Sequence, residues 1–214
     1  MFDLPKSTVY GKTIPKQKFY EELNVPAALK RVFVEQIHKI VWRNKIAPTT
    51  TNIAKSEKVE EIHVFSIQLN QRKLDKRVLP LLDKGIPYHT LFLLEYGGEV
   101  QAWVGYKEPP HAVANKPGMY YNTQWFVPEA LNLLIDGLDM GTVYANFVRQ
   151  IAGERLGGAG IGIEEAVRRD EQRQKLEKQI AALEKKIQNE KQFNRQVELN
   201  AELKRLKREL EGIR

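Results

Sequence analysis

Three glutamates and one lysine are the residues in this sequence whose types could support metal-dependent cleavage of a phosphodiester. They are Glu61, Glu95, Glu99 and Lys107, of which the last three lie on a predicted strand hairpin. Such a site needs several carboxylate oxygens that converge on a divalent ion, with a lysine beside the scissile phosphate. These residues define one hypothesis, a divergent Mg²⁺-dependent nuclease. The pattern is incomplete, because strand alternation would place the lysine at position 101, where the sequence has glutamine.

Histidine and cysteine offer little further chemistry. The chain has four histidines without an H-x-x-x-H pair, and it has no cysteine, which excludes thiolate zinc sites and thiol nucleophiles. His63 and His89 would approach each other if the strands predicted at 61–69 and 90–96 are parallel neighbours. No carboxylate completes that pair, and no G-x-x-x-x-G-K-[ST] or G-x-S-x-G motif occurs. We therefore expect no metal site and no cofactor, apart from Mg²⁺ under the nuclease hypothesis.

Basic residues interleaved with aromatic residues are a better functional lead. One cluster lies near Trp42 on a helix predicted over 26–46, and a second follows the strand predicted at 61–69. Patches of this kind neutralise phosphates without reading base sequence. The alternative is a solvated surface, because glutamates are interspersed with the basic residues. The residues predicted to contact nucleic acid are Lys39, Arg43, Lys45, Arg72, Lys73, Lys76 and Arg77.

Composition places the chain among folded proteins of moderate size. It has 214 residues, 42% of them hydrophobic, and its 34 basic and 27 acidic residues give a formal net charge of +7. No stretch approaches the length of apolar sequence that a membrane span needs, and the first residues contain no apolar leader. We therefore expect a cytoplasmic protein that does not enter a membrane.

The distribution of residue types predicts two parts joined by a hinge. All ten prolines lie at or before Pro128 and all three tryptophans at or before Trp125, whereas residues 153–162 include five glycines. This change in composition along the chain predicts an α+β domain over 1–153, a glycine-rich hinge over 154–163 and a helical segment over 164–214.

The C-terminal segment has the spacing of apolar residues that is typical of paired helices. The two series are Leu176, Ile180, Leu183, Ile187 and, in a different register, Leu199, Leu203, Leu206, Leu210, Ile213. A single coiled coil with a stutter would explain the change of register, and so would two antiparallel helices with a break at 188–194. We favour the helical hairpin, because each series spans only about two heptads and could pack against the other.

Hydrophobic periodicity predicts the elements of the N-terminal part. It favours helices at 16–23, 26–46, 74–84 and from Asp139, and strands at 61–69, 90–96, 99–107 and 119–126. Gly97 and Gly98 form the turn of a hairpin. We therefore expect an α+β fold with a small mixed or antiparallel sheet and flanking helices.

Several short motifs carry a resemblance to a known family. They are Leu4-Pro5-Lys6-Ser7-Thr8, Ile14-Pro15-Lys16 with Phe19-Tyr20, Gly137-Leu138-Asp139 and Lys191-Gln192-Phe193-Asn194-Arg195. Together they resemble signatures of a bacterial family known as domain of unknown function 4391, over essentially the whole chain. The resemblance implies a gene beside helicases and DNA methyltransferases in phage-defence islands, and a partner among these. The resemblance implies no catalytic residue in this chain.

The tip of the predicted hairpin is the expected contact with that partner. Phe193 is the single aromatic residue of 164–214; exposed at the tip it would suit a pocket on a partner, and otherwise it packs between the helices. The residues predicted to bind the partner are Phe193, Arg195, Lys204 and Arg208. We therefore expect an accessory, non-catalytic subunit of a bacterial DNA-processing or phage-defence complex. The alternatives are the nuclease and a self-assembling structural protein that forms a homodimer through the coil.

Overall fold

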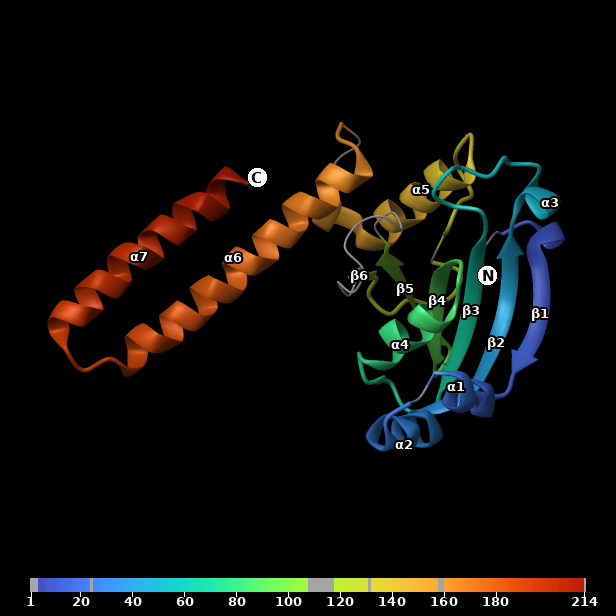
Figure 1. Cartoon of the computed structure of the whole chain (residues 1–214), viewed down its shortest axis with the longest axis horizontal. Coiled ribbons are helices and arrows are strands. Elements are labelled where there is room, and N and C mark those ends of the chain that lie inside the picture. Colours follow the sequence, from blue (N-terminus) through green and yellow to red (C-terminus); the bar gives the residue numbers. More distant parts are fainter. Residues whose placement is uncertain (1–3, 24, 108–117, 131, 158–159, 214) are drawn as a thin grey trace. The chain divides into compact units, whose positions relative to one another are not determined.

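The computed structural model of the chain describes residues 4–23, 25–107, 118–130, 132–157 and 160–213. Its internal contacts divide the chain into two compact units, Met1–Gly153 and Glu154–Arg214. The first unit is built on a six-stranded sheet, and the second is a pair of long helices (Figure 1). This mixed architecture confirms the predicted α+β fold with a helical C-terminal segment.

The strands of the sheet follow one another in space in the order in which they occur in the chain. They are β1 (Val9–Ile14), β2 (Ile37–Ile46), β3 (Ile62–Leu69), β4 (His89–Tyr96), β5 (Glu99–Tyr106) and β6 (Met119–Asn122). Neighbours are antiparallel except for β3 and β4, which are parallel and are joined by a crossover that contains α4 (Val78–Gly85). The sheet is therefore mixed, and its strands β3 to β6 agree with the prediction.

Both faces of the sheet are covered. On one face Phe65 and Phe92 pack with side chains of α2 (Ala27–Gln36) and α4, and α1 (Lys16–Glu22) adds Phe19 to this cluster. On the other face Leu93 and Val104 are fully buried, and α5 (Met140–Ala152) contacts β5 and β6. The Asp139 side chain caps α5 by accepting a hydrogen bond from the Thr142 backbone N–H at 2.8 Å, as its position before the helix predicted.

The helix predicted over 26–46 is wrong in its second half. The helix ends at Gln36, and Ile37–Ile46 is strand β2. A β-bulge follows Ile37, so that Ile37 and Ile40, three residues apart, pair with Leu69 and Ile67 and share one face of the sheet. A three-residue spacing of apolar side chains also indicates a helix. Because of the bulge, the apolar residues of this strand have the three-residue spacing that is expected of a helix.

The sequence analysis also missed two elements. Strand β1 pairs with β2 at the edge of the sheet, and most of its side chains are exposed, so it lacks an alternating apolar pattern. The short helix α3 (Pro48–Thr51) follows β2. The Thr50 hydroxyl donates to the Lys45 carbonyl oxygen at 2.9 Å and accepts from the Ala47 N–H at 2.9 Å, which fixes the end of β2.

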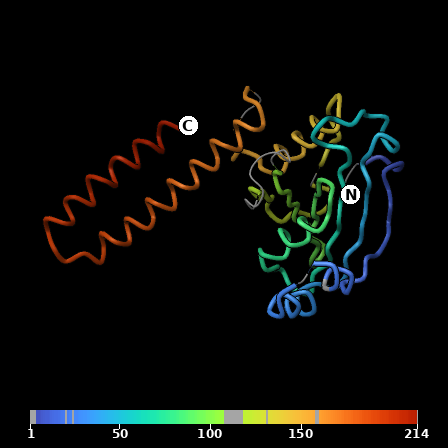
Figure 2. The backbone as a smooth tube through the Cα atoms, in the orientation of Figure 1, coloured from blue at the N-terminus to red at the C-terminus, as the bar shows by residue number. Residues whose placement is uncertain are grey.

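The second unit is an antiparallel pair of helices, α6 (Ile163–Asn189) and α7 (Phe193–Gly212), connected by a short break at 190–192 (Figures 1 and 2). Leu176, Ile180 and Leu183 of α6 pack against Leu199 and Leu206 of α7. The Lys207 ammonium lies 2.8 Å from the Glu184 carboxylate across the pair. The break falls within the predicted interval, and the two apolar series lie on separate helices.

The start of this unit is held by a buried carboxylate. The side chain of Asp170 is fully buried and pairs with Arg155 at 2.8 Å and with Arg173. Arg155 belongs to the short 3₁₀ helix η2 (Gly153–Leu156), so the pair ties η2 to α6. The hinge predicted over 154–163 includes Gly158 and Ala159, which lie outside the described residues. Among the helices that the structure describes, none combines the length and the apolar character that crossing a membrane requires.

Candidate functional site

The structure does not bring the four nuclease candidates together. Glu61 precedes β3, whereas Glu95 lies near the end of the parallel strand β4, opposite Gln68. Gln68 comes seven positions after Glu61, which corresponds to about 23 Å along a strand. Glu99 begins β5 beside the hairpin turn, and Lys107 follows the other end of that strand. Within the described residues there is no group of three side chains suited to hold a metal ion.

Each of the four is instead paired with a different side chain. The Glu61 carboxylate lies 3.0 Å from the Lys45 ammonium, and Glu95 lies 3.4 Å from Arg43. Glu99 pairs with Arg72 at 2.9 Å, and Lys107 pairs with Asp83 at 2.9 Å. Each of these four charged residues therefore has its own ion-pair partner, and the four do not form a common site.

His63 and His89 lie on neighbouring parallel strands, as predicted, but they do not face each other. His63 is aligned with Thr90, and His89 is aligned with Ile62. Side chains on a strand alternate between its two faces, so the two imidazoles lie on opposite faces of the sheet. The expected approach of the two histidines is therefore wrong.

Two of the predicted basic residues on β2 lie far apart. On β2, Lys39 is aligned with Gln68 and Lys45 with His63, which places them at opposite ends of β3. Arg72 lies over the Trp125 ring, 5.6 Å from its centroid. The side chains of Lys39, Lys73 and Lys76 are exposed.

Arg77 is also engaged locally, because it forms an ion pair with Asp75 at 2.7 Å. The hydrogen bonds from Arg77 hold the pKa of Asp75 at about 2. Like Arg43 and Arg72, Arg77 therefore has a carboxylate partner at close range.

A groove of roughly 500 Å³ lies where β1, α1, β2, β3 and the loop before β4 meet. This volume is in the range of pockets that bind small molecules and single nucleotides. Its aromatic and basic side chains come from segments far apart in the chain. They are Tyr10 and Lys12 of β1, Lys18 and Phe19 of α1, Trp42 of β2, His63 and Phe65 of β3, and Tyr88 of the loop.

Four of these rings form a continuous series, which we call the aromatic ribbon: Tyr10, Trp42, His63 and Tyr88. Successive ring centroids are separated by 4.2 Å between Tyr10 and Trp42, 4.4 Å between Trp42 and His63, and 4.7 Å between His63 and Tyr88. His63 is buried, Tyr10 is 37% exposed, and Trp42 and Tyr88 are half-buried. The outer members of the ribbon are therefore accessible to a ligand.

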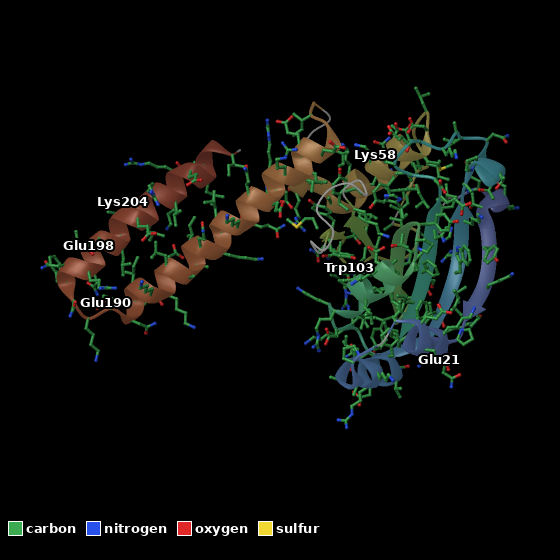
Figure 3. All side chains as sticks on the ribbon, in the orientation of Figure 1. Glu21, Lys58, Trp103, Glu190, Glu198 and Lys204 are labelled. Atoms are coloured by element: carbon green, nitrogen blue, oxygen red, sulfur yellow. The ribbon has the colours of Figure 1, made fainter. Side chains whose placement is uncertain are left out.

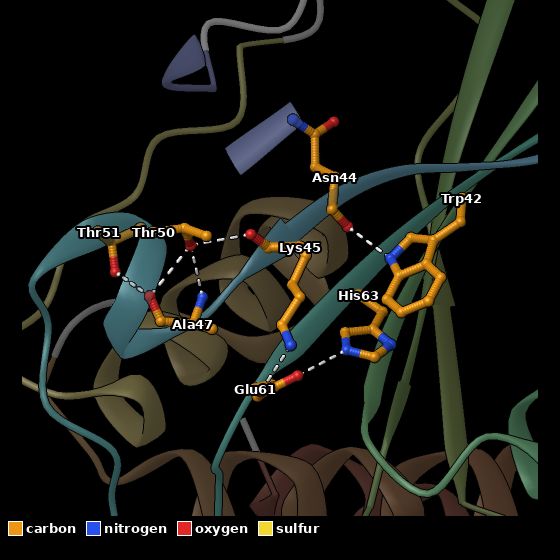
Figure 4. A network of polar contacts seen from close by, with 8 residues as sticks. All are labelled: Trp42, Asn44, Lys45, Ala47, Thr50, Thr51, Glu61 and His63. Carbon is orange, nitrogen blue, oxygen red and sulfur yellow. Dashed lines mark hydrogen bonds and ion pairs between the residues drawn. The ribbon is translucent and has the colours of Figure 1, made fainter. Parts of the chain in front are cut away.

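The two middle members of the ribbon, Trp42 and His63, are oriented by hydrogen bonds (Figure 4). The His63 Nε2 atom lies 3.0 Å from the Glu61 carboxylate, which also binds Lys45, and the Trp42 indole N–H donates to the Asn44 carbonyl oxygen at 3.1 Å. Burial lowers the pKa of His63, and the hydrogen bond to Glu61 offsets only part of this effect. Partial burial acts to raise the pKa of Glu61, but hydrogen bonds with His63 and Lys45 leave it lowered. At neutral pH the imidazole is neutral and the carboxylate is charged.

Two exposed lysines give the groove a positive outer end. The Lys12 ammonium lies 4.7 Å from the centroid of the Tyr10 ring, and Lys18 lines the groove from α1. Among the described residues that line the groove, Glu22 is the one carboxylate, so the balance of charge there is positive. Gly11, between Tyr10 and Lys12, has a φ of 68°, a conformation that favours glycine.

The wall that carries Tyr88 is fixed by a set of polar groups, which we call the polar anchor: Asp83 and Thr90, which are buried, and Lys107 and Tyr120, which are half-buried. The Lys107 ammonium donates to the Tyr88 carbonyl oxygen at 2.8 Å and to the Asp83 carbonyl oxygen at 3.2 Å. The Asp83 carboxylate accepts from Tyr120 at 2.8 Å and from the Thr90 hydroxyl. These bonds connect the end of α4 with β4, β5 and β6.

A glycine makes room for the polar anchor. A Cβ atom at Gly105 would lie 2.7 Å from the Tyr120 ring and 3.0 Å from the Asp83 carboxylate. Burial, together with the charge of Asp83, raises the pKa of Tyr120 far above its usual value, so this hydroxyl remains a donor to Asp83.

The sequence analysis named some of these groups and missed others. It noted Trp42, His63 and Lys107, but in other roles. It did not name the groove residues Tyr10, Lys12, Lys18 and Tyr88. The segment Tyr10-Gly11-Lys12 combines an aromatic ring, a glycine and a cation, which is the local signal that could have drawn attention to β1.

Comparison with known proteins places the whole chain in one family. No curated protein and no solved structure matches it. A family model described as domain of unknown function (DUF4391) matches residues 2–210. The chain therefore belongs to the DUF4391 family.

Proposed function

We propose that this protein is a non-catalytic accessory subunit of a cytoplasmic DNA-processing or phage-defence complex, and that its N-terminal unit contacts nucleic acid. The observation that carries the proposal is the groove in which Lys12 and Lys18 lie beside an aromatic surface. Positive side chains next to aromatic rings are the combination with which proteins bind single-stranded nucleic acid. The candidate carboxylates, by contrast, are separated and individually paired with cations, which favours binding over metal-dependent cleavage.

The two lysines should account for much of the salt dependence of binding. We expect the Lys12→Glu/Lys18→Glu variant to bind a short single-stranded oligonucleotide at least tenfold more weakly at low salt. The slope of log affinity against log salt should fall by about 1.4, because each phosphate contact contributes about 0.7 for a single strand. Fluorescence anisotropy of a labelled oligonucleotide, titrated at several salt concentrations without divalent metal, measures both quantities.

A matched variant controls for the change in net charge. Lys55 is exposed and does not line the groove. Lys55→Glu changes the net charge by the same two units as Lys12→Glu or Lys18→Glu alone. It should leave the slope nearly unchanged, whereas each of those single variants should lower it by about 0.7. Absence of binding by the unaltered protein at low salt would refute the proposal. Cleavage of the oligonucleotide on addition of Mg²⁺ would show instead that the protein is an enzyme.

The tip of the helical pair is the proposed contact with the partner protein. Phe193 is 76% exposed at the start of α7, so it does not pack between the helices, and Val197, one turn further on, is 54% exposed. Arg195 lies 3.7 Å from Glu190 at the same tip. Figure 3 shows Glu190 at the break, with Glu198 and Lys204 along α7. The side chains of Lys204 and Arg208 are exposed further along the helix.

We expect Phe193→Ala to abolish co-purification with the proposed partner, a helicase or a DNA methyltransferase, because large exposed aromatic residues contribute most to such contacts. The neighbouring change Asn194→Ala serves as the control and should leave the complex intact. Co-expression with affinity purification of the partner measures the outcome. If Phe193→Ala instead converts a dimer of this chain into a monomer, the self-assembly alternative is correct.

A further inference from the structure

We infer that the aromatic ribbon binds unpaired bases, which stack on Tyr10 at its open end while their phosphates lie against Lys12 and Lys18. This inference rests on the proposed contact with nucleic acid and specifies its ligand as a single strand or an extruded nucleotide. A base within a duplex is already stacked on both sides, so its faces cannot reach a ring on the protein.

The arrangement of the groove matches the two chemical parts of a nucleotide. Tyr10, at the open end of the ribbon, is 37% exposed, and the cation of Lys12 lies 4.7 Å from the centroid of its ring. A base that stacks at this end places its sugar and phosphate within reach of the exposed lysine side chains. Stacking is tolerant of sequence, because every base has a π-face.

The middle of the ribbon, around His63, suits an uncharged ring. The buried His63 has a lowered pKa and is neutral at neutral pH. The negative charge of Glu61 is compensated by Lys45 at 3.0 Å. Among the described residues that line the groove, the two lysines Lys12 and Lys18 carry the positive charge, at its outer end, where a phosphate would lie.

The wall opposite β1 is held in place before a ligand arrives. Lys107 binds the carbonyl oxygen of Tyr88 at 2.8 Å, and the Asp83 carboxylate binds Lys107 at 2.9 Å. Gly85 lies against Leu23, where an added Cβ atom would come within 2.2 Å of a methyl group. Because the loop is fixed from both sides, little conformational freedom is lost when a base binds, which favours affinity.

The test uses a single-stranded oligonucleotide that carries one 2-aminopurine, a fluorescent adenine analogue whose emission is quenched by stacking. Binding is followed by anisotropy of a terminal dye, and stacking is followed by the 2-aminopurine emission. We expect the full-length protein to quench the emission several-fold on binding the single strand. A duplex of the same sequence should bind more weakly.

The variant Tyr10→Ala removes the exposed ring from the open end of the ribbon. We expect it to weaken binding of the single strand by roughly tenfold or more and to restore most of the emission. Tyr96→Ala is the matched control, because Tyr96 is also 37% exposed but lies at the β4–β5 turn, outside the groove. Trp42→Phe keeps a ring in the ribbon and should retain the quenching.

The outcomes separate this inference from the proposed function. If Tyr10→Ala changes neither affinity nor emission while Lys12→Glu/Lys18→Glu weakens binding, the stacking of bases is wrong and the contact with nucleic acid stands. Equal affinity for duplex and single strand with no quenching would also overturn the inference. If the unaltered protein binds no oligonucleotide at low salt, both fall together.

Discussion

His89 shows how one side chain connects burial to stability. It packs edge-on against the Tyr144 ring, 4.4 Å between centroids, and it lies close enough to Lys107 to sense its charge. Burial, with a contribution from Lys107, lowers the pKa of His89 to about 4. In the unfolded chain the same imidazole would have a pKa near 6.5. The folded protein therefore holds His89 in its neutral form.

This shift predicts a loss of stability in mild acid. Between about pH 6.5 and pH 4, His89 binds a proton in the unfolded chain but not in the folded chain. The free energy of unfolding therefore falls as the pH is lowered across this window. The loss attributable to His89 should be on the order of 2 kcal/mol between pH 7 and pH 4, with His63 adding to it in the same direction. We expect His89→Phe, which keeps a ring against Tyr144, to reduce this dependence. Urea unfolding at several pH values measures it.

The exposed His38 provides the comparison, because His38→Gln should leave the pH dependence of stability unchanged. Identical dependence in the unaltered protein and in His89→Phe would show that burial of His89 does not have this effect.

Individual residues were easier to find in the sequence than their roles. Lys107 was noted as the lysine of a nuclease, but its ammonium binds Asp83 and the carbonyl oxygen of Tyr88, 24 and 19 residues earlier. Glu61 was noted as a metal ligand, but it orients His63. Such roles depend on partners that only the folded chain brings close. Residue type and local spacing do not specify them.

At the scale of elements, the local patterns predicted most helices and strands, and they failed where geometry is irregular. The β4–β5 hairpin and α5 have their own signals, Gly97-Gly98 at the turn and Asp139 at the cap. Strand β2 was assigned to a helix because its bulges change the two-residue alternation of a strand. Strand β1 was missed because an exposed edge strand needs no apolar alternation.

The helical pair is the element most completely predicted, because the four-three spacing of its apolar residues is local and regular. It belongs to a compact unit of its own, which begins after Gly153. All three tryptophans lie in the first unit, so tryptophan fluorescence reports on that unit alone. Far-UV circular dichroism at 222 nm, by contrast, also follows the helical pair, because α6 has 27 residues and α7 has 20, about half of the helical residues that the structure describes.

We expect Leu183→Ala to lower the stability of the helical pair by about 2 to 3 kcal/mol, because it removes a buried side chain from the interface of α6 and α7. The thermal transition followed at 222 nm should shift to lower temperature. The transition followed by tryptophan fluorescence should remain in place. An equal shift of both signals would mean that the two units unfold together. Gln188→Ala, on the same helix and outside the apolar cluster, is the control.

At the scale of the whole molecule, the sequence predicted the fold class but not the groove. The groove is lined by residues from Tyr10 to Tyr88, which come from three strands, a helix and a loop. No short motif contains these side chains together. They become neighbours because β1 and β2 pair in one register and α4 returns the chain to the edge of β3. A site assembled in this way becomes visible only once the topology is known.

The order of the strands has a further consequence for how the protein is made. Each strand of the described sheet is hydrogen-bonded to the strand that precedes it in the chain, and the helical unit contributes no strand. The sheet can therefore grow vectorially as the polypeptide leaves the ribosome, one strand at a time. At the parallel step, β4 must wait for the crossover through α4. By the time α6 is synthesised, the groove already has every residue that it needs.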